Sequence, residues 1–122
     1  MLLSHPTVLV THSLRSYREA LSSWLRAQRP AISVAECEPR VLDLARARYA
    51  PYLVICDAPT PAMRRSSTVL AWIELRPPGG SSLVHLGDQE RPAPDLALPE
   101  ILEIVDAAQD WKLEQLASQD PV

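Results

Sequence analysis

The most constraining stretch of this sequence is a short apolar run that ends in a carboxylate, Tyr52-Leu53-Val54-Ile55-Cys56-Asp57. The run is rich in β-branched residues and too short for a free-standing helix, so it predicts a strand. Its residues are apolar at successive positions, which is typical of a central strand in a parallel sheet covered by helices on both faces. In such sheets ligands bind at the carboxyl ends of the strands. Asp57 is therefore the first residue to consider for function.

The other predicted elements alternate along the chain. The patterns predict strands at 7–11, 32–35, 82–86 and 96–98, and helices at 14–29, 39–50, 66–75 and 99–117. Ser13 is expected to cap the first of these helices, and the proline-containing stretch 88–94 is expected to be a loop. Alternation of this kind predicts a doubly wound α/β fold with five parallel strands, helices on both faces and right-handed crossovers.

The bulk composition fits one globular domain over residues 1–122, with frayed ends at 1–6 and 118–122. A net charge of -3 argues against a nucleic-acid-binding face. No apolar run approaches the roughly 18 residues that span a bilayer. The N-terminus also lacks the features of a signal peptide, so a cytoplasmic location is expected. Cys37 and Cys56 are not part of a CxxC pair, so we expect reduced core thiols and no metal site.

The segment Asp57-Ala58-Pro59-Thr60-Pro61-Ala62-Met63 resembles the phosphoacceptor segment of response-regulator receiver domains. In that family an aspartate after an apolar strand is followed four residues later by proline, and two residues further on by methionine. The resemblance covers nearly the whole chain and implies a flavodoxin-like fold in bacterial two-component signalling. Receivers have a helix between the fourth and fifth strands. The matching stretch 88–95 is short and rich in proline, so this fourth helix is expected to be shortened or missing.

The positions that match the rest of the receiver active site lack the required groups. Thr11 and His12 stand where receivers have the acidic pair that holds Mg²⁺, an ion that prefers oxygen ligands. Gly87 replaces a hydroxyl residue, and Leu98 replaces a lysine. Phosphoryl transfer depends on such charges, and losing one electrostatic donor typically costs roughly 3–4 kcal/mol. We therefore expect a pseudo-receiver that binds no metal and retains only a vestigial site around Asp57.

Three of these polar residues have alternative interpretations. Asp57 is either the phosphoacceptor of an atypical receiver or a polar residue at the end of a strand. His12 either pairs with Asp57, directly or as a second transition-metal ligand, or caps the edge of the sheet. His85 lies inside an apolar strand and is expected in the core.

An anion site and a cofactor site are further alternatives. Five arginines form a basic surface for which solvation is the favoured interpretation: Arg40, Arg46, Arg48, Arg64 and Arg65. A small flavodoxin-like enzyme would need a bound cofactor. The chain has three glycines and no Gly-rich phosphate loop, so we expect neither a cofactor nor catalytic residues.

The missing fourth helix predicts an interaction surface. Both faces of a parallel sheet need cover, and an exposed apolar patch usually marks a binding site. We expect a protein partner, or a second copy in a homodimer, to bind the fifth strand and the last helix through Leu96, Leu98, Ile101, Val105 and Trp111. The sequence thus predicts a non-catalytic protein–protein interaction module that acts independently of phosphorylation, with no nucleic-acid or membrane partner.

Overall fold

The computed structural model describes residues 6–66, 70–76, 81–87, 89–94 and 96–118. Most of the two predicted frayed ends lies outside these residues. In chain order the elements are β1 (Thr7–Thr11), α1 (Arg15–Gln28), β2 (Ser33–Cys37), the 3-10 helix η1 (Pro39–Val41), α2 (Leu42–Tyr49), β3 (Leu53–Cys56), α3 (Pro61–Arg65), β4 (Ala71–Glu74), β5 (Ser82–Leu86), β6 (Gln89–Ala93) and α4 (Leu98–Ser118).

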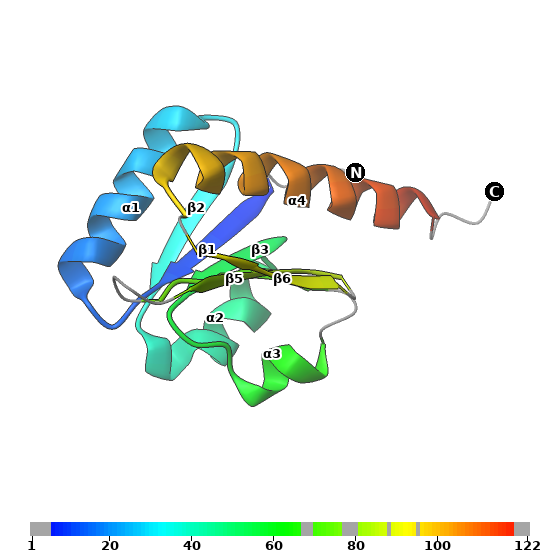
Figure 1. Cartoon of the computed structure of the whole chain (residues 1–122). Helices are drawn as coiled ribbons and strands as arrows, with labels where there is room; N and C mark the ends of the chain where they lie inside the picture. Colours follow the sequence, from blue (N-terminus) through cyan, green and yellow to red (C-terminus); the bar gives the residue numbers. More distant parts are fainter. Residues whose placement is uncertain (1–5, 67–69, 77–80, 88, 95, 119–122) are drawn as a thin grey trace.

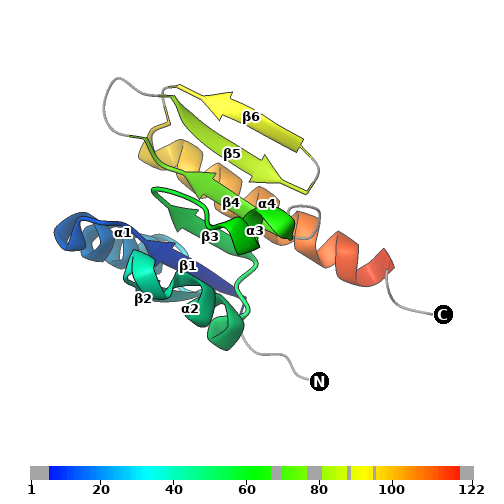
Figure 2. The same cartoon turned by 90° about the horizontal axis from the view of Figure 1, so that it is seen from below.

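All six strands form one sheet in the order β2-β1-β3-β4-β5-β6. The first four strands are parallel, whereas β5 runs antiparallel to β4 and β6 runs antiparallel to β5, as Figure 2 shows from below. The predicted α/β class is confirmed. The prediction of five parallel strands is wrong, because the sheet is mixed and has six strands.

The stretch 66–75, which was predicted as a helix, contains a strand. Ala71–Glu74 forms β4 and all four residues are buried; residues 67–69 of that prediction lie outside the described part. Periodicity alone does not separate a short buried helix from a buried strand. Burial on both faces of the sheet favours the strand here.

The crossover between β3 and β4 uses the short helix α3 instead. Pro61 lies in its first turn. Proline is favoured there because the backbone N–H that it lacks would have no partner within the helix. The Thr60 hydroxyl accepts a hydrogen bond from the Met63 amide at 3.2 Å and caps the helix. Met63 is fully buried beneath the sheet. The segment that resembles a phosphoacceptor loop therefore folds into a capped helix that covers β3.

The predicted loop at 88–94 contains the edge strand β6. Leu86 of β5 pairs with Gln89 of β6, and two positions separate them, of which the structure describes only the first. The first of them, Gly87, has a φ of 65°, which a glycine adopts without strain. Pro92 fits an edge strand because its nitrogen can face away from the ladder. The predicted fifth strand at 96–98 is also wrong, since Leu98 already belongs to α4.

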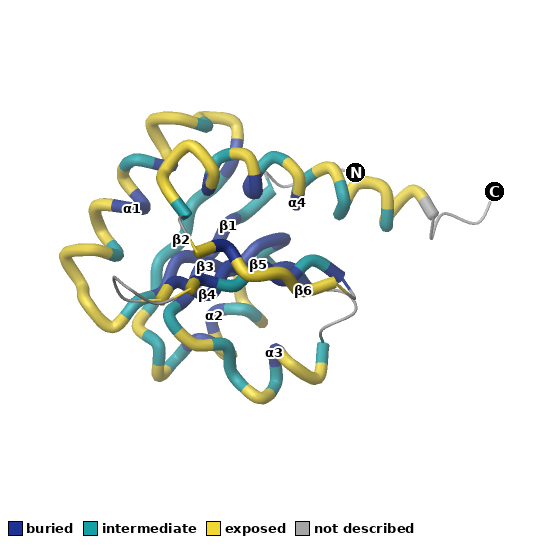
Figure 3. The backbone as a smooth tube through the Cα atoms, viewed as in Figure 1, coloured by how far each residue is buried: buried dark blue, intermediate teal, exposed yellow. Residues whose placement is uncertain are grey.

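Two apolar layers enclose the sheet (Figure 1). Helices α1 and α4 cover one face around a core that includes Leu25, Ile55 and Val105, and α2 and α3 cover the other face around Leu42 and Met63. The strands carry most of the buried positions, as Figure 3 shows. Among the described residues, no helix is long and apolar enough to cross a membrane.

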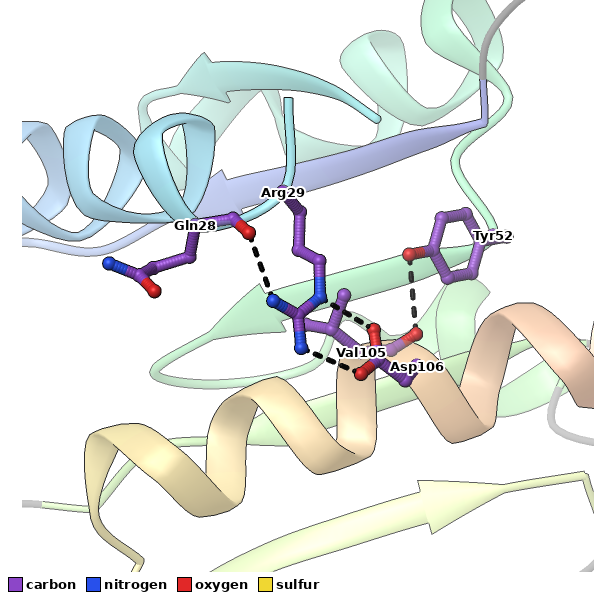
Figure 4. A network of polar contacts seen from close by, with 5 residues as sticks. All are labelled: Gln28, Arg29, Tyr52, Val105 and Asp106. Carbon is purple, nitrogen blue, oxygen red and sulfur yellow. Dashed lines mark hydrogen bonds and ion pairs between the residues drawn. The ribbon is translucent and has the colours of Figure 1, made fainter. Parts of the chain in front are cut away.

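A polar tie joins the two helices on the first face (Figure 4). Arg29 follows α1 and donates to both carboxylate oxygens of Asp106 in α4, at 2.9 and 2.8 Å. Beside this pair, the Tyr52 hydroxyl donates to the Val105 carbonyl at 3.3 Å. The Arg29 hydrogen bond lowers the pKa of Asp106 below its ordinary value, against a smaller opposing effect of burial. The tie fixes where α4 crosses the end of α1.

Candidate functional site

The carboxyl edge of the parallel strands brings Ser13 and Asp57 together. In the parallel pairing of β1 with β3, Val10 lies opposite Ile55, so the residues that follow each strand meet. The Ser13 amide donates to Asp57 Oδ2 at 3.2 Å, and the Ser13 hydroxyl donates to the same oxygen. The expected role of Ser13 as a helix cap is wrong, since α1 has no side-chain cap. Ser13 instead holds the Asp57 carboxylate.

The environment of Asp57 favours its charged form. Partial burial opposes ionisation, but the hydrogen bonds from Ser13 and from the Asp57 amide outweigh it, so the pKa of Asp57 is lowered from its ordinary value. The side chain is partly exposed at the edge of the sheet. The site thus contains an ionised carboxylate whose Oδ2 accepts two hydrogen bonds from one neighbour.

The His12 side chain bonds to Leu14, the residue that precedes α1. Its Nδ1 accepts a hydrogen bond from the Leu14 amide at 3.0 Å, and its carbonyl accepts one from Arg18 at 3.0 Å. Its ring lies 4.7 Å from the ring of Tyr17. Within the described residues no three His, Cys, Asp or Glu side chains are placed to hold a metal ion.

Two positions of the predicted vestigial site, Gly87 and Leu98, do not join Asp57. Because β5 is antiparallel, its end at Gly87 lies at the opposite edge of the sheet, against the indole of Trp111. Leu98 is the first residue of α4 and is 46% exposed. Thr11 does lie at the Asp57 edge, where it is buried. Gly87 was matched to a receiver position on the assumption that its strand is parallel. Because β5 is antiparallel, this match is wrong.

Glu74 is a polar residue of this edge that sequence reasoning missed. It ends β4 opposite Cys56 and is 4% exposed. Its carboxylate pairs with Arg76 at 2.6 Å and with Arg64 at 3.8 Å. The available signal was an acid that closes an apolar run, the same pattern that singled out Asp57. The two arginines neutralise this buried charge, as buried carboxylates require.

The two cysteines flank Thr11 on neighbouring strands. Cys37 pairs with Thr11 across β2 and β1, and Cys56 lies on the far side in β3. Two strand spacings of about 4.8 Å separate the cysteine backbones by roughly 10 Å, beyond the reach of a disulfide. Burial, with the charges of Glu74 and Asp57, raises the pKa of Cys56 to about 12. Its thiol is therefore unreactive, and both cysteines are free.

The predicted partner-binding residues divide between core and surface. Ile101 and Val105 are buried in the core, and Leu96 and Trp111 are partly buried against it. These four pack within the protein, which leaves Leu98 as the exposed member of the set. The far end of α4, which extends past the sheet in Figure 1, carries two exposed leucines that were not predicted, Leu113 and Leu116.

Comparison of the chain with protein-family models, with curated proteins and with solved structures gives no significant match. The function must therefore be inferred from the residues and their geometry.

Proposed function

We propose that this chain is a receiver-like protein–protein interaction module of bacterial signalling or transcriptional regulation, which acts without phosphorylation or catalysis. The flavodoxin-like part of the proposal is supported by the order of the four parallel strands, β2-β1-β3-β4, which flavodoxin-like folds also use. The receiver-like part is supported by Asp57, which follows the central strand β3 and precedes the helix that carries Met63.

The observation that carries the proposal is the environment of Asp57. A phosphoacceptor needs cations around its carboxylate, because the transferred phosphoryl group brings negative charge. Here Oδ2 is held by Ser13, and neighbouring Thr11 and His12 supply no carboxylate for Mg²⁺. Lys112 is the only lysine in the sequence, and it follows Trp111, which packs on Gly87 at the opposite edge. Retaining the fold without this chemistry favours a role in binding.

The surface of α4 supports an interaction role. Leu113 is 58% exposed and Leu116 is 53% exposed, one turn apart on the helix. The stretch of α4 before them is tied to α1 through the Arg29–Asp106 pair, and α1 ends there. Beyond that point the side of α4 that faces α1 is left open. Exposed apolar side chains on a helix are common elements of protein interfaces.

A titration with Mg²⁺ and beryllofluoride, a mimic of phosphoryl-aspartate, tests the absence of phosphoryl chemistry. We expect the amide NMR signals around Asp57 to stay unchanged, in the native chain and in the control Asp57→Asn alike. A saturable shift in the native chain that is lost in Asp57→Asn would overturn the proposal. It would favour the alternative, an atypical receiver phosphorylated on Asp57, for which the ionised and partly exposed carboxylate is the supporting observation.

A further inference from the structure

One side of α4 is acidic and unpaired. Its exposed carboxylates come from Glu100, Glu103, Asp110 and Glu114. Their spacing places them along one side of the helix, with Ala107 between them. Within the described part of the chain, no cationic side chain forms an ion pair with any of the four. We call this side the acidic face of α4.

An apolar crevice opens beside the middle of the acidic face. It has a volume of about 150 Å³ and lies between Ala107 of α4 and the hairpin β5–β6. Its walls are mostly apolar and include Val84, Leu86 and Ile104. The polar residues His85, Gln89, Glu90 and Arg91 complete the lining on the hairpin side. Engineered apolar cavities of about 150 Å³ bind benzene. The crevice is therefore large enough for one branched aliphatic side chain.

A second surface of the same chain has the opposite chemistry. Leu44 of α2 is 74% exposed, the highest value among the exposed large apolar side chains of the described residues. Arg48 follows it by four residues and so lies beside it on the same side of α2. Arg40 comes four residues before it in η1, where it pairs with Glu38 at 2.7 Å. The side chain of Arg40 is 81% exposed. We call Arg40 of η1, together with Leu44 and Arg48 of α2, the basic face of α2.

We infer that the chain associates with itself, with the basic face of α2 in one copy bound to the acidic face of α4 in the next. Leu44 would enter the crevice at Ala107, and Arg40 and Arg48 would approach Glu103 and Asp110. Along their helices the two arginines are about 12 Å apart and the two acids about 10 Å apart, so the charges match in spacing. This inference rests on the proposed interaction role of α4 and names its partner as a second copy.

The two faces lie on opposite sides of the sheet, with α2 below it and α4 above it in Figure 1. A contact between two different surfaces leaves one of each free on every pair, so association continues beyond the dimer into an open chain or a closed ring. One helix on another is a small contact, below about 1,200 Å². The association should therefore be weak, and salt should weaken it further because the charges are exposed.

Two complementary variants test the inference by sedimentation velocity over a series of protein concentrations. Leu44→Glu destroys the basic face, and Ala107→Arg fills the crevice and reverses its charge. We expect the sedimentation coefficient of the native chain to rise with concentration, and each variant alone to remain monomeric. An equimolar mixture should form a heterodimer and stop there, since only one pair of faces remains intact. Leu14→Glu, a substitution of another exposed leucine, should associate like the native chain.

Circular dichroism checks that each variant is folded, and Leu44→Ser repeats the test of α2 without adding a charge. A native chain that remains monomeric at every concentration overturns the inference. So does self-association that survives both variants, or a mixture that stays monomeric while the native chain associates. These outcomes are separate from the beryllofluoride titration. A monomer that does not respond to beryllofluoride retains the proposed function with another partner.

Discussion

At the scale of single residues, Asp57 shows how one neighbour can change what a carboxylate does. Asp57 stands where a phosphoacceptor would, at the end of the central strand β3. Its Oδ2 accepts hydrogen bonds from both the amide and the hydroxyl of Ser13. These bonds keep the side chain ionised and link the loop after β1 to the loop after β3. Asp57 is therefore part of the structure of this edge.

Replacing Ser13 by alanine tests that link. We expect the pKa of Asp57 to rise in Ser13→Ala, because one of the bonds that favour the carboxylate is lost. A lowered folded-state pKa gives stability above the unfolded-state pKa, which is lost as pH falls through the folded value. The loss at neutral pH should be about 1 kcal/mol, below the roughly 1.5–3 kcal/mol of a buried charged hydrogen bond, because solvent screens the site.

The pKa can be measured by following the Asp57 carboxyl carbon by NMR, and the stability by urea unfolding at pH 7. Ser23→Ala, at an exposed position of α1, is the control and should leave both quantities unchanged. An unchanged Asp57 pKa in Ser13→Ala would contradict the assigned role of Ser13.

At the scale of elements, the burial of α4 differs between its two sides and between its two ends. Ile101, Ile104, Val105 and Ala108 are buried on its inner side, whereas the last turns carry exposed leucines. The inner residues face the sheet, and the outer ones extend beyond the end of α1. Apolar residues are therefore part of the core in the first half of α4 and part of the surface in its last turns.

Substitutions within α4 separate its core from its surface. Ile101→Ala should lower the free energy of unfolding by about 3 kcal/mol, because it removes buried methyl groups and leaves a cavity. Leu113→Ser and Leu116→Ser should each change it by less than about 0.5 kcal/mol, as exposed substitutions usually do. Urea unfolding followed by circular dichroism measures all three. A loss in Leu116→Ser equal to that in Ile101→Ala would show that the end of α4 is packed in solution.

The β5–β6 turn depends on Gly87 for two separate reasons. Its φ of 65° is strained for a residue with a side chain, at a cost of about 1–2 kcal/mol. A methyl group there would also lie 3.1 Å from Cζ2 of Trp111. Gly87→Ala should therefore lower the free energy of unfolding in urea by about 2 kcal/mol. In a chain that also carries Trp111→Leu, Gly87→Ala should lower the free energy of unfolding only by the amount due to backbone strain. An equal loss of stability with and without Trp111→Leu would argue against the contact with Trp111.

At the scale of the whole molecule, the Arg29–Asp106 pair holds α4 against α1. Because Arg29 lowers the pKa of Asp106, the pair stabilises the fold above the ordinary carboxyl pKa of 3.8, and this contribution is lost as pH falls through the lower folded value. Asp106→Asn should thus reduce the urea midpoint at pH 7 and have a smaller effect at pH 3. Glu19→Gln, which breaks the exposed Arg15–Glu19 pair, is the control and should change little at either pH.

The first half of the molecule could be predicted from the sequence, and the second half only in part. The strands at 7–11 and 53–56 and the helices around Leu25 and Ala45 follow from strong local patterns and proline boundaries. The strand at 71–74 was misread because the short apolar run Leu70-Ala71-Trp72-Ile73 fits two periodicities. The β5–β6 hairpin was missed although Gly-Asp between two strand patterns is a known turn signal.

The candidate site could likewise be predicted from the sequence only in part. Asp57 was found because a lone carboxylate that ends an apolar strand is a local signal. Its partner Ser13 was not found, since 44 residues separate the two and only the parallel pairing of β1 with β3 brings them together. Gly87 and Leu98 were assigned to the same edge under the assumption that every strand is parallel. The reversal of β5 removes Gly87 from that edge.

The sequence alone determined the α/β class, the central strand and the carboxylate at its end, because these depend on neighbouring residues along the chain. Only the tertiary structure decided the direction of β5 and β6, the neighbours of Asp57 and the exposed part of α4. The sequence of residues 82–86 predicts a strand but does not by itself give the direction of that strand. That direction is set by which connection lets the whole chain cover both faces of the sheet.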